Sequence, residues 1–288
     1  MWEYVALFAV ALGVSAFGTI VGFGGGVFMV PILVLIFHIP IQLAIGCVIL
    51  ALFPSALIST AHNFKRGLID FPVGVLLEIP TVAGTVLGAW LTSYLPTWQL
   101  EILFSVLVVF TGWTMVRQGG AGSSSRLLIF KKLNDLPPRM VRRTANGAYA
   151  ISGVTVTSFG LLSGIIAGLF GIGGGFIKGP LMVLGFGMPA RVAAPTALFM
   201  IVITSAVGSV SHYLLGHIQW EVGLFLVLAF TLGSLLGNRK AGSITEKNLF
   251  QFIAWGLIAA GLSMALFTVS QLNLRSARQD GTVPGRRP

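Results

Sequence analysis

Gly22-Phe23-Gly24-Gly25-Gly26, followed by Pro31, is the stretch that decides how this sequence folds. It recurs as Gly171-Ile172-Gly173-Gly174-Gly175, followed by Pro180, at a constant offset of 149 residues. Each copy interrupts a strongly apolar run. A backbone break inside a membrane helix is tolerated only where it is buried in protein or lines a cavity. Two such breaks at matching positions of two halves predict the binding site of a transporter.

The composition of the chain indicates an integral membrane protein. Hydrophobic residues make up 55% of the 288 residues and charged residues 9%, and the mean hydropathy is +0.92. A soluble domain carries about 25% charged residues, so that class is excluded. Several apolar runs reach about 20 residues, the length that crosses a bilayer as a helix. We therefore expect an all-α polytopic membrane protein.

Ten apolar segments are predicted, five on each side of a polar stretch. The segments run approximately over residues 4–21, 27–38, 41–60, 71–94, 98–116, 149–170, 176–186, 192–215, 220–236 and 247–271. The second and seventh are expected to be half-helices or re-entrant segments, because a helix of about 12 residues spans only about 18 Å. The chain thus divides into a first repeat, a basic linker, a second repeat and a polar tail, at residues 1–117, 118–146, 147–273 and 274–288.

The offset of 149 residues also holds for glycines far from the two clusters. It pairs Gly84 with Gly233 and Gly88 with Gly237. Matches of this kind predict an internal duplication. The spacing of four residues within each half is typical of tight helix packing in membranes, and this is the role expected for these four glycines.

The number of crossings in each half decides how the two repeats are related. An odd number, with the short segment counted as a crossing, gives inverted repeats. Re-entrant short segments give an even number and parallel repeats. The basic residues of the linker and of the short loops favour inversion and place the linker in the cytoplasm.

Several other classes of protein are disfavoured. The net charge of +10 does not indicate nucleic-acid binding, because the basic residues lie mostly in loops and in the tail. Cys47 is the only cysteine, which excludes an internal disulfide and a cysteine metal cluster. Neither glycine cluster continues into Gly-Lys-Ser/Thr, so no nucleotide-binding loop is present. Without an acid–base pair or ligand set at usable spacing, we expect no enzyme, no metal site and no cofactor.

The two glycine clusters are candidates for an anion site built from main chain. Successive N–H groups in a glycine run point into one concavity, and the short helix that follows adds the positive end of its dipole. Gly24, Gly25 and Gly26, together with residues 173–175 (Gly173, Gly174 and Gly175), are therefore predicted to bind a small oxyanion. The alternative is that these glycines only allow close helix packing.

Four side chains are added to this site. Lys178 lies three residues after the second cluster and supplies a fixed cation, unless its side chain reaches the membrane surface. Thr196 and its repeat mate Cys47 begin the helices that follow the two motifs. Glu78 is an intramembrane carboxylate and a candidate for proton coupling, with a water-facing position near the interface as the alternative.

The chain resembles the TauE/SafE-type sulfite exporter family, the permeases related to toluene-sulfonate uptake. The resemblance rests on the doubled Gly-x-Gly-Gly-Gly-x-x-x-x-Pro pattern and on Ala193-Ala194-Pro195-Thr196, and it covers about residues 13–266. In the first half, Cys47 stands where the family often has Thr. The resemblance implies a permease of the bacterial cytoplasmic membrane that moves sulfite, sulfonates or related small organic anions.

The sequence thus predicts a secondary transporter of small sulfur-containing anions. Its partners are the anionic substrate and the lipid bilayer, and a homo-oligomer is compatible with the sequence, whereas nucleic acid is not expected. A passive anion channel is the alternative function.

Overall fold

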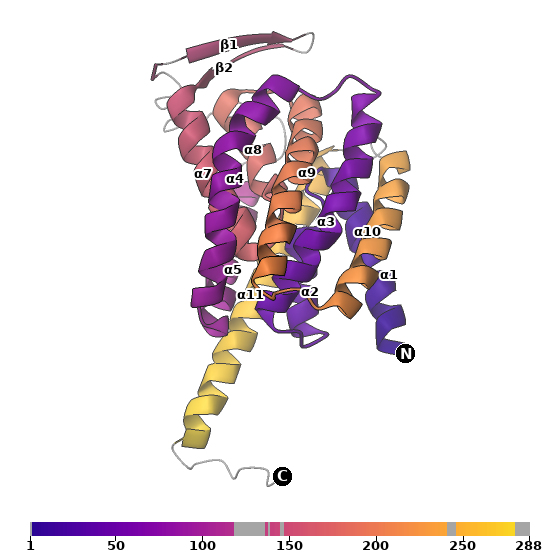
Figure 1. The fold of residues 1–288 in the computed structure, drawn as a ribbon, viewed down its shortest axis with the longest axis vertical. Coiled ribbons are helices and arrows are strands. Elements are labelled where there is room, and N and C mark those ends of the chain that lie inside the picture. Colours follow the sequence, from indigo (N-terminus) through magenta and orange to yellow (C-terminus); the bar gives the residue numbers. More distant parts are fainter. Residues whose placement is uncertain (1, 118–135, 138, 145–146, 241–245, 280–288) are drawn as a thin grey trace.

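The computed structural model describes residues 2–117, 136–137, 139–144, 147–240 and 246–279. Figure 1 shows a bundle of helices with a β-hairpin at one end. The elements are α1 (Trp2–Val21), α2 (Gly26–Leu35), α3 (Ile41–Phe64), α4 (Phe71–Tyr94), α5 (Thr97–Arg117), β1 (Arg139–Thr144), β2 (Gly147–Ser152), α7 (Gly153–Phe170), α8 (Gly175–Phe186), α9 (Ala190–Leu214), α10 (Trp220–Lys240) and α11 (Glu246–Gln279).

The helical membrane fold is confirmed. Eight helices within the described residues are long and apolar enough to cross a bilayer. α2 is shorter, with 10 residues, and α8 has 12. Both short helices begin where the sequence predicts them, because the preceding glycines end α1 and α7 in backbone conformations that a helix cannot continue.

The first helix and the short helix after it enter the bundle and return to the same end. Tyr4 of α1 donates a hydrogen bond to Glu221 at the start of α10. α2 runs back to this end, where Cys47 of the following helix donates to the carbonyl of Gln219 (Figure 1). α7 and α8 enter and return at the opposite end, beside the β-hairpin (Figure 1).

This arrangement corrects the expectation that re-entrant short helices make the repeats parallel. The long helices extend along most of the bundle: Thr92, in the last turn of α4, donates to the Leu169 carbonyl at the end of α7, and a Cβ on Gly237, in the last turn of α10, would lie 2.5 Å from the Ala16 carbonyl oxygen of α1. α2 and α8 then return to the ends at which α1 and α7 begin, so the change of side in each half is made by α3, α4 and α5 or by α9, α10 and α11 (Figure 1). The two halves start from opposite ends of the bundle even though their short helices are re-entrant. That the halves arose by duplication stays a prediction.

Long helices pack pairwise across the two halves. α3 packs against α9, α4 against α7, α1 against α10 and α5 against α11. The glycines expected to pack do so: a Cβ on Gly84 would lie 2.3 Å from the Leu161 carbonyl oxygen, and one on Gly233 would lie 2.5 Å from that of Leu12. The absence of a side chain at these positions lets two backbones touch.

Two boundaries differ from the prediction. Tyr149, expected to begin a membrane helix, lies in β2, which pairs with β1 in antiparallel register, and α7 begins only at Gly153. Ser152 is the N-cap of that helix, and its hydroxyl accepts from the N–H of Val154. At the other end of the chain, α11 continues to Gln279, beyond the predicted start of the polar tail. The glycine- and serine-rich part of the linker lies outside the described residues.

Candidate functional site

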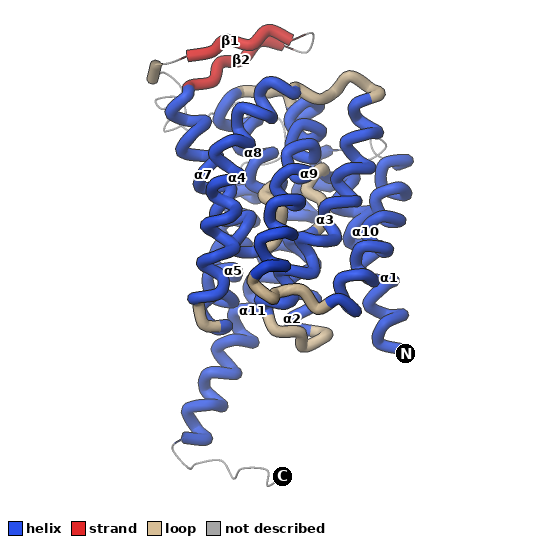
Figure 2. Tube along the Cα trace, viewed as in Figure 1, coloured by secondary structure: helices blue, strands red, loops and turns tan. Residues whose placement is uncertain are grey.

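Both glycine breaks lie in the middle of the bundle. Figure 2 shows them as loop segments between helices, away from the loops at either end. Gly24 and Gly173 both have positive φ, and a Cβ on either would contact the side chains of Leu52 and Ile201. These two apolar residues, at the midpoints of α3 and α9, therefore fill the space between the breaks.

The first break offers fewer N–H groups to a ligand than the sequence suggests. The N–H groups of Gly22, Phe23 and Gly24 all donate to the carbonyl oxygen of Gly18, at distances of 2.9–3.0 Å. Gly25 then caps α2 in a left-handed conformation, and Gly26 is its first residue. Since the first N–H groups of a helix have no acceptor within it, only the start of α2 can still serve an anion here.

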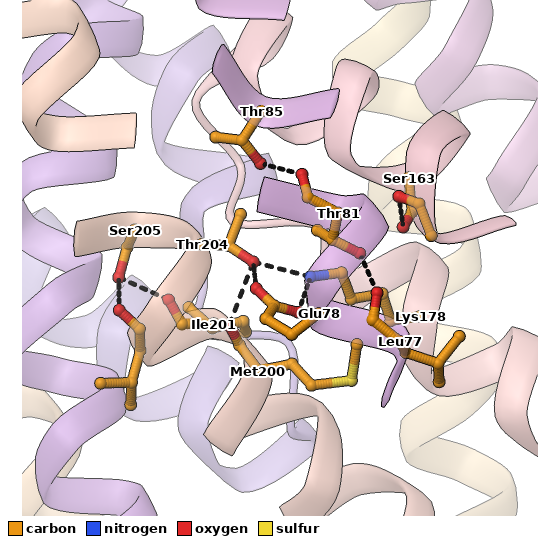
Figure 3. Close-up of polar contacts among 12 residues, drawn as sticks. Leu77, Glu78, Thr81, Thr85, Ser163, Lys178, Met200, Ile201, Thr204 and Ser205 are labelled. Atoms are coloured by element: carbon orange, nitrogen blue, oxygen red, sulfur yellow. Dashed lines mark hydrogen bonds and ion pairs between the residues drawn. The ribbon is translucent and has the colours of Figure 1, made fainter. Parts of the chain in front are cut away.

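The second break lies next to a buried ion pair. Lys178 of α8 donates one hydrogen bond to Glu78 of α4, with 3.0 Å between Nζ and Oε2, and another to the hydroxyl of Thr204 of α9, at 2.7 Å. The Thr204 hydroxyl in turn hydrogen-bonds the other carboxylate oxygen of Glu78. Figure 3 shows the three side chains converging from three helices. The two residues singled out separately by sequence thus form one centre.

Burial makes this centre costly to assemble and sensitive to change. The side chains of Lys178 and Glu78 are only 2% and 3% exposed. Taking two charges out of water is offset only when the pair has good geometry and further hydrogen bonds. Thr204 supplies such bonds to both partners. Neither of the alternative positions, a lysine at the membrane surface or a water-facing glutamate, is therefore adopted.

The lysine side chain lies directly over the second glycine break. A Cβ on Gly174 would come within 3.1 Å of Lys178 Cε. Gly174 is also the N-cap of α8, with φ of 71°, and Gly175 is the first residue of that helix. The ammonium group and the positive end of the α8 dipole therefore act on the same region, an arrangement that favours an anion.

The sequence of the chain matches that of a known family of membrane proteins. The model of the family described as "Sulfite exporter TauE/SafE" matches residues 7–264. The chain belongs to this family. Among TauE/SafE relatives, it is 28% identical to the probable membrane transporter protein YunE of Bacillus subtilis, over 91% of this chain and 97% of that protein. It is 36% identical to sulfite exporter TauE/SafE family protein 3 of Arabidopsis thaliana over 36% of this chain and 23% of that protein. No solved structure gives a significant match.

Membership of the TauE/SafE family defines the protein as a membrane transporter and not an enzyme. It does not favour the passive channel. In the part of the chain that the structure describes, no group of three His, Cys, Asp or Glu side chains could hold a metal ion.

Thr196 and Cys47 do not join this centre. The Thr196 hydroxyl donates to the Val192 carbonyl at 2.7 Å and accepts from the backbone N–H of Asp70 at 3.0 Å. Cys47 donates to Gln219 at the other end of the bundle. The two residues match by sequence offset, but the opposite directions of α3 and α9 separate them.

Other polar contacts of this TauE/SafE chain could not be predicted from its sequence. The Tyr149 hydroxyl donates to the buried carboxylate of Asp70, which also caps α4 through the N–H of Val73. Thr204 is one of many hydroxyl residues in α9, and most of them donate to a carbonyl one turn back in their own helix, as such side chains commonly do. Thr204 differs from the other hydroxyl residues of α9 only because α4 and α8 bring Glu78 and Lys178 next to it.

The buried ion pair has no counterpart at the first break. At the offset of 149 residues, Lys178 corresponds to Met29 and Glu78 to Val227, while Thr204 corresponds to Ser55. The first break therefore has no ammonium group and no carboxylate beside it. An anion site in this TauE/SafE protein is expected at the second break.

Proposed function

We propose that the protein is a secondary transporter of small sulfur-containing oxyanions, such as sulfite or sulfonates, and that the anion binds where Lys178 and Thr204 meet the start of α8. The observation that carries this proposal is the carboxylate of Glu78 already seated there. A carboxylate and a sulfite or sulfonate group are both compact anions with hydrogen-bond-accepting oxygens. The family description and the Arabidopsis relative name sulfite, which supports this substrate class.

Binding of the anion has a consequence for Glu78. When the substrate takes Lys178 and Thr204 as its partners, the Glu78 carboxylate loses them and is left buried. An unpaired buried charge is strongly unfavourable, and protonation of the carboxylate removes it. Uptake of one proton by Glu78 therefore accompanies binding, and anion and proton move together. We expect Glu78→Gln to bind the anion without taking up this proton.

The membrane is proposed to be the cytoplasmic membrane. α3 and α10 end, and α9 begins, at the end of the bundle that carries the β-hairpin (Figure 1). The residues at these helix ends include Lys65, Arg66, Arg191, Arg239 and Lys240. Basic residues concentrate in loops that face the cytoplasm. This end of the bundle is accordingly assigned to the cytoplasmic side.

The function is tested with purified protein in liposomes. Counterflow of labelled sulfite, sulfate, sulfoacetate, taurine and a neutral sugar is measured with the wild type. Saturable counterflow of sulfite or sulfoacetate, and none of the sugar, is the expected result. Absence of counterflow for both of these anions would contradict the proposed substrate class.

The site is tested with a charge-neutral double variant. Lys178→Met alone leaves Glu78 buried without its cation and destabilises the protein by about 3–5 kcal/mol. Lys178→Met combined with Glu78→Gln removes both charges, so the fold is retained. We expect at least a tenfold loss of counterflow in the double variant and none in the control Lys65→Met, an exposed lysine. Wild-type counterflow in the folded double variant would exclude this site.

A further inference from the structure

A second buried polar cluster lies at the end of the bundle opposite the β-hairpin. His212 of α9 is fully buried, and its Nε2 lies 2.8 Å from the Gly168 carbonyl oxygen of α7. Its Nδ1 lies 3.0 Å from Nδ1 of His217, in the loop between α9 and α10. Nε2 of His217 is 3.4 Å from the hydroxyl of Ser93 at the end of α4.

The chemistry of these contacts fixes the positions of the protons. A carbonyl oxygen only accepts, so Nε2 of His212 carries a hydrogen. In the neutral ring Nδ1 is then an acceptor, and Nδ1 of His217 must donate to it. Nε2 of His217 remains as an acceptor toward Ser93. The contacts form one directed chain, which runs from the half-buried His217 to the buried His212.

This chain can take up one proton without breaking a contact. A proton that binds Nε2 of His217 allows the hydrogen on its Nδ1 to pass to Nδ1 of His212. His217 is then neutral again and His212 is the cation, still bonded to Gly168. A second proton would place hydrogens on both facing Nδ1 atoms and break the contact. The geometry therefore admits one additional proton for the pair.

Side chains with hydroxyl groups lie in a row between His212 and the ion-pair centre. Ser209, one turn before His212 on α9, has a buried hydroxyl with no hydrogen-bond partner among the described residues. Thr85 of α4 approaches the same stretch, because a Cβ on Gly208 would lie 3.4 Å from its methyl group. Further along α4, the Thr85 hydroxyl donates to the Thr81 carbonyl and the Thr81 hydroxyl donates to the carbonyl of Leu77, the residue before Glu78 (Figure 3). His212 and Thr204 are eight residues apart, or about 12 Å along the helix.

Given the proposed function, we propose that His217 and His212 form the uptake site for the coupling proton of this transporter. His212 releases its Nε2 proton toward the hydroxyl of Ser209, the hydroxyl row and intervening water carry it on, and the carboxylate of Glu78 receives it. Before the next proton binds, each ring exchanges its hydrogen through water, from Nδ1 to Nε2 in His212 and from Nε2 to Nδ1 in His217, which restores the starting tautomers. The coupling proton thus enters from the end of the bundle that holds the α9–α10 loop.

The surroundings of the pair suit this role. Partial burial lowers the pKa of His217 below its usual range, so this histidine is neutral at rest and takes up a proton as the pH falls. The other titratable side chains at this end of the packed helices are Cys47, Tyr94, Tyr213 and Glu221. Within the described residues, none of these forms an ion pair or hydrogen bond with either histidine. α7 carries no titratable side chain.

The inference is tested by separating proton flux from anion exchange. Proton entry into liposomes is followed with a trapped pH dye during sulfite uptake, and sulfite counterflow is measured in the same preparation. His212→Gln and His217→Gln are compared with the control His62→Gln. His62 lies in the last turn of α3, at the end of the bundle away from the pair. Protonation of sulfite itself contributes equally to the measured proton entry in every variant. A difference in proton entry between variants therefore comes from the protein.

We expect the two variants of the pair to lose at least tenfold in coupled proton flux while counterflow stays within twofold of wild type. His62→Gln should match wild type in both. Full proton flux in His212→Gln and His217→Gln would overturn the inference, as would sulfite uptake without proton flux in wild type. Absence of counterflow in wild type would instead count against the proposed function.

A second measurement does not depend on transport. The chain has four histidines, so a His38→Gln, His62→Gln background leaves only the pair. Nitrogen NMR of labelled histidine should show His212 protonated at Nε2 and His217 at Nδ1 at neutral pH, and uptake of one proton for the pair on acidification. Independent uptake of two protons would refute a shared site.

Discussion

Single residues decide the chemistry at the centre of the bundle. Lys178 and Glu78 are 100 residues apart in the chain, and hydrocarbon tolerates neither charge alone. Each is stable only because the other, together with Thr204, is positioned by a different helix. The sequence marks both residues as unusual, since a charge inside an apolar segment is rare. It does not show that they are partners.

Gly174 offers a test at this scale. Gly174→Ala forces a side chain into a left-handed conformation and against Lys178, whose Cε would lie 3.1 Å from the new Cβ. The backbone strain alone costs about 1–2 kcal/mol. Gly67→Ala is the matched control, because Gly67 has φ of 65° and nothing within 4 Å of its Cβ position. Both variants should lose similar stability in thermal unfolding, but only Gly174→Ala should lose sulfite binding. Unchanged binding in Gly174→Ala would limit this glycine to a structural role.

Glycine residues allow pairs of helices to pack at very short distances. α4 and α7 approach so closely that a Cβ on Gly164 would lie 2.1 Å from the Thr81 carbonyl oxygen, and one on Gly168 at the same distance from that of Thr85. α4 carries Glu78, so the packing of these two helices sets the position of the carboxylate. The sequence predicts such packing from the four-residue spacing of small residues, but it does not identify the partner helix.

The consequence for this helix pair is measurable. Gly164→Ala should move α4 away from α7 and destabilise the protein by about 1–3 kcal/mol, the usual effect of overpacking. Gly13→Ala in α1 has open space around its Cβ position and should be neutral or slightly stabilising, since alanine favours a helix. Thermal unfolding of the two variants in the same detergent compares them. Equal midpoints would show that the close approach of the backbones is not required.

The arrangement of the whole molecule rests on the two re-entrant helix pairs. Because α2 runs back to the end at which α1 begins (Figure 1), Ile36, its C-cap, lies on the side of the N-terminus, and Arg66 follows the C-cap of α3 on the opposite side. Cys47 is buried, so single cysteines can be introduced at exposed positions with little background labelling.

Labelling in intact cells tests this arrangement. An impermeant thiol reagent should modify Ile36→Cys and Tyr4→Cys, both on the side assigned to the exterior, and should leave Arg66→Cys unmodified until the membrane is opened. Modification of Tyr4→Cys but not of Ile36→Cys from outside would mean that α2 does not return to the side of the N-terminus.

The sequence by itself determined the membrane class, the two helix breaks with their short helices, and the unusual status of Lys178 and Glu78. These features depend on local properties, namely apolar length, glycine conformation and the cost of burying a charge. Tertiary structure alone decided that α1 and α2 return together, that Leu52 and Ile201 fill the space between the breaks, and which helices meet. Such contacts join residues far apart in the chain, and an apolar helix surface fits many partners equally well until the whole bundle is assembled.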